Sequence, residues 1–85
     1  FDEVIERAND NDLGLCSYLY TNSMDKAHIG SEKLESGCVA VNTGVVAIAE
    51  APFGGIKQTG YGREGGSGAI KDYLNVKYTH MGLKI

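Results

Sequence analysis

The chain has 85 residues, of which 42% are apolar and 22% are charged, and its formal net charge is −3. This length allows one domain at most, and the composition is that of a globular protein, not of a disordered or membrane-embedded one. No apolar run approaches the roughly 20 residues of a transmembrane helix, and the mild acidity excludes an electrostatic reason for a nucleic acid or membrane partner. Cys16 and Cys38 form no CxxC or Cys/His cluster, so we expect two reduced thiols in a cytoplasmic protein without a metal site.

The first predicted element is an amphipathic helix at the start of the chain. Phe1, Val4, Ile5 and Ala8 recur at i, i+3, i+4 and i+7, which is the apolar stripe of a helix. The polar run 9–12 ends it. Because the helical pattern is already under way at the first residue, we expect either that an upstream segment was removed or that the chain is a piece of a longer polypeptide.

An aromatic-rich strand is predicted next, over residues 15–21, because the run is apolar and bounded by turn residues. A second helix follows. Asn22 or Ser23 is its expected N-cap, and Gly37 is its expected C-terminal stop. Residues 38–41 then predict a short apolar strand.

The second half of the chain is predicted to be mostly irregular. Residues 44–49 are expected to form a loop, and residues 69–74 a short helix with one apolar face. Residues 75–81 alternate Val76, Tyr78 and His80 with polar residues, which predicts a half-buried strand. Helices alternating with strands indicate an α/β fold. Three short strands would leave unpaired edges, so we expect an incomplete unit that associates with other elements or with itself.

Residues 51–66, which read APFGGIKQTGYGREGG, are the most informative stretch of the chain. They contain the only proline and many of the twelve glycines. Glycine is favoured where the backbone turns with positive φ or packs closely against a neighbour, so the stretch predicts a shaped loop that faces a partner or ligand. Residues 60–65 match G-x-G-x-x-G, but no buried strand precedes them and position 80, where an acidic residue is expected, is a histidine. We therefore reject a dinucleotide fingerprint.

Three side chains of this stretch have two interpretations each. Phe53, beside two glycines, either lines a substrate pocket or packs on the body of the protein. Arg63 and Glu64 form either an internal ion pair or a subunit contact, and both are more plausible than a catalytic role.

No combination of residues in the sequence forms a complete catalytic site. Cys16 and Cys38 each lie in an apolar strand pattern, where a thiol is usually inert. His28 and His80 have no carboxylate or second histidine at ligand spacing. There is no Ser/His/Asp set and no pair of carboxylates. We therefore predict no catalytic, cofactor-binding or metal-binding residue in this segment, and we expect the chemistry to come from elsewhere in a longer protein.

Residues 50–65 resemble the C-terminal signature of NAD(P)-dependent aldehyde dehydrogenases. The resemblance covers essentially the whole chain, because other motifs of the family occur in the family's order: AND at 8–10, LGL at 13–15, LESG at 34–37, VNTG at 41–44, DYL at 72–74 and VKY at 76–78. The combination of Asn42-Thr43-Gly44, EAPFGG and the DYLxVKY ending most resembles the succinate-semialdehyde dehydrogenase branch.

The resemblance implies the C-terminal part of an α/β catalytic domain (residues 1–74, with a glycine-rich loop at 50–68), followed by an oligomerisation strand and tail (residues 75–85). In the family a cysteine attacks the aldehyde, hydride passes to NAD or NADP, and a glutamate-activated water hydrolyses the thioester. These groups lie N-terminal to the present segment, and neither Cys16 nor Cys38 matches the nucleophile. The resemblance thus implies a fragment of an aldehyde-oxidising oxidoreductase that is inactive alone and binds no cofactor.

Substrate contacts are implied for Phe53, which matches an aromatic in the substrate tunnel, and for Ala47 in the substrate mouth. The succinate-semialdehyde branch has a serine at the position of Ala47 that helps to hold the distal carboxylate. Alanine cannot donate that hydrogen bond, which leaves the exact substrate open.

Oligomer contacts are implied for Arg63 and for Val76, Tyr78 and His80, the last three in a strand that joins a neighbouring subunit's sheet. The expected partners are the remainder of the subunit and its copies in a homo-oligomer. A glutamate often found at the position of Asn75 is missing, which weakens any inferred ion pair with Arg63.

A function of another class remains open from the sequence: a free-standing interaction module that adds its terminal strand to a partner's sheet. A third hypothesis is a nucleotide-binding peptide built on the loop around Gly60, for which we expect no stabilisation by ATP or NAD.

Overall fold

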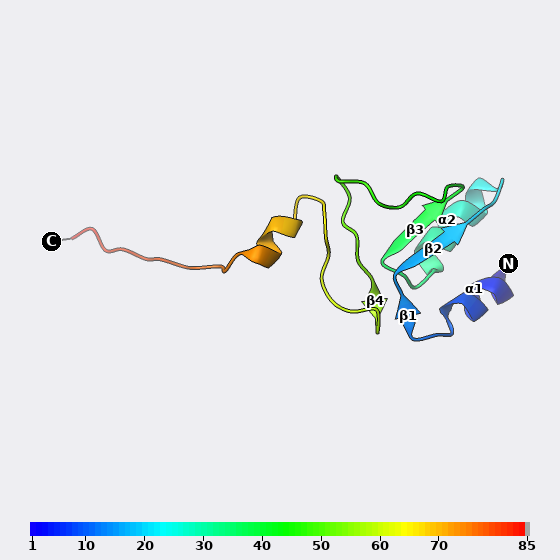
Figure 1. Cartoon of the computed structure of the whole chain (residues 1–85), viewed down its shortest axis with the longest axis horizontal. Helices are drawn as coiled ribbons and strands as arrows, with labels where there is room; N and C mark the ends of the chain where they lie inside the picture. The colour runs from blue at the N-terminus through cyan, green and yellow to red at the C-terminus, as the bar shows by residue number, and fades with distance from the viewer. Residues whose placement is uncertain (85) are drawn as a thin grey trace.

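The computed structural model describes residues 1–84. Its elements follow in the order α1 (Asp2–Asn9), β1 (Leu13–Gly14), β2 (Cys16–Leu19), α2 (Met24–Lys33), β3 (Cys38–Val41), β4 (Ile56–Lys57) and a 3₁₀ turn, η1 (Ala69–Tyr73) (Figure 1). None of the helices formed by residues 1–84 has the length and apolarity needed to traverse a bilayer.

The first two of the three predicted helices form where the sequence places them. α1 carries Asp2 and Glu3 in its first turn, where the helix dipole favours anions. In α2 the Ser23 side chain accepts a hydrogen bond of 3.3 Å from the Lys26 N–H, so Ser23 is the N-cap. The predicted stop at Gly37 is wrong, because α2 already ends at Lys33 and Leu34 is extended.

The centre of the fold is a parallel pair of strands joined by α2. β2 and β3 pair from Cys16↔Cys38 to Leu19↔Val41, and α2 is the crossover that a parallel pair requires. The ladder stops at Asn42, which has φ 58°. Beyond the strands, the Asn42 side chain donates to the Thr21 carbonyl (3.0 Å) and accepts from the Thr21 N–H (2.9 Å). The strand predicted at residues 15–21 is confirmed but is shorter, because β2 covers only Cys16–Leu19.

A second, antiparallel pair is absent from the sequence prediction. β1 and β4 pair through Leu13↔Lys57 and Gly14↔Ile56. This pair places the middle of the glycine-rich loop beside the segment that joins α1 to β2 (Figure 1). The two residues of each strand are too few to give a hydrophobic period, which is why the sequence predicts only a loop here.

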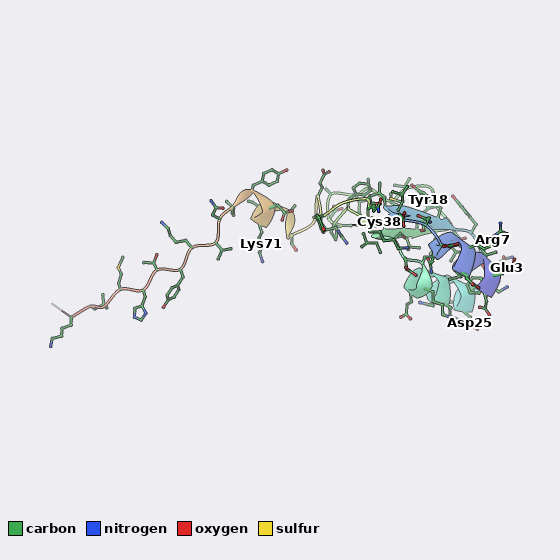
Figure 2. The ribbon with its side chains drawn as sticks, turned by 90° about the horizontal axis from the view of Figure 1, so that it is seen from below. Glu3, Arg7, Tyr18, Asp25, Cys38 and Lys71 are labelled. Atoms are coloured by element: carbon green, nitrogen blue, oxygen red, sulfur yellow. The ribbon has the colours of Figure 1, made fainter. Side chains whose placement is uncertain are left out.

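The apolar core within residues 1–84 is thin. Both helices lie on one side of the β2–β3 pair (Figure 2), although both faces of a parallel sheet are normally covered. Among residues 1–84, only Ile5 and Ala40 are buried apolar residues, at 7% and 5% exposure. The radius of gyration is 18.5 Å, against about 12 Å for a compact domain of this length.

The last part of the chain extends away from this body as a terminal arm, residues 75–84 (Figure 1). The predicted strand at 75–81 is wrong for the chain by itself, because no strand pairing is found there within the described residues. Val76 is fully exposed. Alternating apolar and polar side chains give a segment one apolar face, but a strand also needs the edge of a neighbouring strand to pair with. The short helix predicted before the arm is confirmed as a 3₁₀ turn, η1.

Candidate functional site

The glycine-rich loop (residues 50–68) folds around an open hollow of about 430 Å³. Residues of the loop make most of its wall, and Leu15 and residues of η1 make the rest. Its lining residues are Leu15, Phe53, Gly54, Gly55, Thr59, Gly60, Tyr61, Gly62, Arg63, Glu64, Gly65, Ala69, Asp72 and Tyr73.

Backbone pairing fixes the two sides of the loop against each other. Phe53 and Glu64 exchange hydrogen bonds, 2.6 Å from the Phe53 N–H to the Glu64 carbonyl and 2.7 Å in return. The Arg63 guanidinium donates through Nη1 to the carbonyls of Gly55 and Gly62, each at 2.9 Å. These bonds fix the backbone of the half-buried Phe53 at the wall of the hollow without the help of an apolar core.

The turn at the tip of the loop depends on glycine at two positions. Gly60 has φ 122° and Gly62 has φ 85°. Residues that carry a Cβ rarely adopt a positive φ of this size. The sequence-level prediction of a shaped loop rests on this property of glycine, and the structure confirms it.

Backbone and hydroxyl contacts attach the loop to the body. The Gln58 N–H donates to the Asp12 carbonyl (2.8 Å), and the Gly14 N–H donates to the Thr59 hydroxyl (2.8 Å). A Cβ on Gly37 would overlap the Gly54 carbonyl oxygen. Gly37 therefore serves as a close-packing residue and not as the helix stop.

Lys57 is the main polar anchor of the loop. Its ammonium donates to the carbonyls of Asn9 (3.0 Å) and Asn11 (3.2 Å) and lies 3.1 Å from a carboxylate oxygen of Glu35. Its side chain is 23% exposed, and its φ of 58° is unusual for a residue other than glycine. Sequence reasoning missed Lys57; the only signal was its place inside the glycine motif.

The two cysteines lie opposite each other at the start of β2 and β3. Partial burial raises the pKa of the Cys16 thiol, and the adjacent Cys38 sulfur raises it further. The Cys38 sulfur is 3.9 Å from the Gly54 carbonyl oxygen, where the sheet meets the glycine-rich loop (Figure 2). No group of three His, Cys, Asp or Glu side chains within residues 1–84 is placed to hold a metal ion.

The predicted substrate residues do not share one pocket in this chain. Phe53 lines the hollow, whereas Ala47 is exposed and is not part of its lining. Thr59, Asp72 and Tyr73 line the hollow without having been singled out by their sequence.

The predicted interface residues also lie in two different parts of the chain. Arg63 lies in the hollow, where it donates to carbonyl oxygens instead of pairing with Glu64. The other predicted interface residues lie in the terminal arm. Tyr78 and His80 contact each other there, with 2.9 Å between the hydroxyl and Nδ1.

A sequence profile described as "Aldehyde dehydrogenase family" matches residues 1–79. The chain therefore belongs to the aldehyde dehydrogenase family.

Particular relatives are substantially similar. The chain is 49% identical to a 3-sulfolactaldehyde dehydrogenase of Pseudomonas putida over 95% of its own length and 17% of the relative's. It is 46% identical to an NADP(+) succinate-semialdehyde dehydrogenase of Escherichia coli K12, again over 95% and 17%. A solved NAD+ complex of an aldehyde dehydrogenase from Bacillus cereus superposes with a TM-score of 0.89 and 42% identity, covering 98% of this chain and 17% of that one. The chain thus spans about a sixth of the length of these relatives.

Proposed function

We propose that this chain is the C-terminal segment of a cytoplasmic enzyme that oxidises an aldehyde with a distal anionic group to the carboxylate, with NAD or NADP. Two relatives support the substrate class by their names: succinate semialdehyde carries a carboxylate and 3-sulfolactaldehyde a sulfonate. Succinate semialdehyde is the first choice, because the chain carries the VNTG, EAPFGG and DYLxVKY motifs together.

The observation that carries the proposal is the way the glycine-rich loop presents Phe53. Reciprocal backbone bonds with Glu64 fix the backbone of Phe53, a residue that lines an open hollow. An aromatic side chain carried on such a fixed backbone is suited to orient the carbon chain of a small substrate. We assign Phe53 to the wall of the substrate tunnel and Ala47 to its mouth, and we assign the nucleophilic cysteine and the glutamate to the remainder of the subunit.

The residues of this chain do not fit a dinucleotide. Residues 60–65 follow the two-residue strand β4 and lead into the five-residue η1, whereas a dinucleotide loop joins a buried strand to a full helix. We therefore place NAD or NADP binding in the remainder of the subunit.

The terminal arm supports an assembly role. Its large apolar side chains are exposed, Val76 fully and Tyr78 by 81%, and its backbone has no ladder partner within residues 1–84. We propose that residues 75–81 add a strand to the sheet of a neighbouring subunit in a homo-oligomer. Val76, Tyr78 and His80 would form the contact, with Arg63 at the edge of the same interface.

The test compares the full polypeptide that contains this chain with the 85-residue chain alone. Each is mixed with succinate semialdehyde and either NAD or NADP, and the appearance of reduced nicotinamide is followed. We expect turnover by the full polypeptide only, with butanal, which lacks the distal carboxylate, as the poorer substrate. Turnover by the 85 residues alone, or a preference for butanal, contradicts the proposal.

A variant of the full polypeptide tests the assignment of Phe53. Phe53→Ala is expected to lower kcat/KM by roughly 10- to 100-fold, the range for losing a hydrophobic pocket contact. Phe53→Tyr, which keeps the ring, is the matched control and is expected to retain most of the activity. Equal kcat/KM in Phe53→Ala and the wild type excludes a tunnel position for this ring.

A second candidate function rests on the same terminal arm. A free-standing module with this unpaired segment could bind a partner by β-augmentation. The coding sequence upstream of Phe1 distinguishes the two: a cofactor fold with a cysteine nucleophile supports the enzyme, and a start codon immediately before Phe1 supports the module.

A further inference from the structure

The parallel register of β2 and β3 places two thiols directly opposite each other. Cys16 pairs with Cys38 at the first position of the ladder. Adjacent strands lie about 4.8 Å apart, which is within the roughly 4.4–6.8 Å between the Cα atoms of a disulfide. Residues that pair directly across two strands point to the same face of the sheet. The backbone therefore brings both cysteines to one side of the sheet, with a Cα spacing that a disulfide allows.

The face that carries these thiols is the one without helices. Side chains alternate along β2, and Leu19 points to α2, where a Cβ on Gly30 would lie 2.5 Å from its Cδ2. Cys16, three positions earlier, points to the opposite side. Both cysteines are only half-buried, and they are the only two in the 85 residues. A small oxidant therefore reaches them within this chain.

We propose that Cys16 and Cys38 are a modification site that forms a reversible disulfide between β2 and β3 on exposure to a peroxide. One thiolate attacks the peroxide oxygen and becomes a sulfenic acid as the O–O bond breaks. The second thiol then displaces water from that sulfur. Two thiols and one hydrogen peroxide give one disulfide and two waters. The proposal concerns the strands alone and does not depend on the aldehyde-oxidising function.

The bridge has a local consequence at the glycine-rich loop. The Cys38 thiol lies 3.9 Å from the Gly54 carbonyl, at the distance of a weak S–H donor. Oxidation removes that hydrogen. Oxidation therefore breaks the weak hydrogen bond to the carbonyl of Gly54, which is the neighbour of Phe53.

The test detects the bond itself in the full polypeptide. The native protein is treated with hydrogen peroxide in mildly alkaline buffer, which supplies thiolate. Free thiols are blocked with iodoacetamide, and the protein is digested with trypsin. Cleavage after Arg7, Lys26, Lys33 and Lys57 separates the cysteines into peptides 8–26 and 34–57. We expect these peptides joined and two hydrogens lighter than their sum, and separated again by dithiothreitol.

Variants and a denatured control make the result specific. Cys16→Ser and Cys38→Ser should each abolish the joined peptide completely, and treatment of the protein in guanidinium should yield much less of it than native treatment. Separate peptides that are both alkylated, cysteines oxidised individually to sulfinic acid, or a bond from either cysteine to a third one in the polypeptide each overturn the proposal. The wild-type digest alone decides the question if a serine variant does not fold.

Discussion

The glycine-rich loop and the terminal arm differ in how their conformations are fixed, and each differs from what its composition alone suggests. The loop is rich in glycine, which is costly to order, yet it is fixed by the Phe53–Glu64 pairing, by Arg63 and by Lys57. The arm has the alternating pattern of a strand and large apolar side chains, yet its residues 75–84 form no strand pairing within the described chain.

The difference lies in where the backbone finds its partners. Backbone N–H groups of the loop donate to the carbonyls of Asp12 and Ala49 and to carbonyls within the loop, and the Thr59 hydroxyl accepts from the Gly14 N–H. Side chains of the arm extend outward instead (Figure 2), and its residues 75–84 make no backbone hydrogen bond within the described chain. A fixed conformation requires bonding partners for the backbone, so a glycine loop that has them is better defined than an apolar strand that lacks them.

The largest expected effect comes from breaking the contact between loop and body. Gly37→Ala introduces a Cβ that overlaps the Gly54 carbonyl oxygen, and backbone on both sides leaves little room to relax. We expect the full polypeptide to lose about 3 kcal/mol of unfolding free energy, the upper part of the range for overpacking. Denaturant titration measures the loss.

Gly82→Ala in the terminal arm is the matched control for that change. A Cβ at Gly82 meets no atom within 4 Å, so we expect a stability change within about 0.5 kcal/mol. Similar losses in the two variants would show that the loop does not pack against Gly37 as described.

A smaller effect is expected from removing the polar anchor of the loop. Lys57→Ala removes the hydrogen bonds to the Asn9 and Asn11 carbonyls and the ion pair with Glu35. We expect a loss of about 1–2 kcal/mol, because bonds from a charged donor exceed neutral ones but part of the side chain is solvated.

Glu35→Gln separates the two contributions of that anchor. It keeps the carbonyl bonds of Lys57 and removes only the ion pair, whose Glu35 side chain is 53% exposed, so we expect at most about 1 kcal/mol. If Glu35→Gln costs as much as Lys57→Ala, the carbonyl bonds contribute nothing and the anchor is only an ion pair.

The smallest effect on internal stability is expected from deleting the arm. Truncation after Leu74 should leave hydrogen exchange at Phe53, Glu64 and Gly14 in the 85-residue chain unchanged, because their bonds lie within the body. Self-association, measured by sedimentation at high concentration, should decrease instead, because the unpaired segment is gone. A truncated chain that associates as strongly as the intact one would falsify the assembly role of the arm.

Sequence alone determined the elements whose signals are local. The i, i+3, i+4 stripe predicted α1, a cap at Asn22 or Ser23 predicted the start of α2, and the apolar runs predicted β2 and β3. Helical periodicity and capping act over a few residues, so these predictions are confirmed. Glycines at 60 and 62 likewise predicted turns that need positive φ. The roles of Phe53 and Ala47 in substrate binding stay predictions.

Tertiary structure decided the contacts between residues far apart in the chain. Leu13 pairs with Lys57, Gly37 packs on Gly54, and Cys16 faces Cys38. No local pattern encodes which distant backbone comes to lie alongside. For that reason β4 and the anchoring by Lys57 were missed, and the strand predicted at 75–81 finds no pairing partner within the described residues. A strand is stabilised by hydrogen bonds to a neighbouring segment, and the sequence of one segment does not specify which neighbour supplies them.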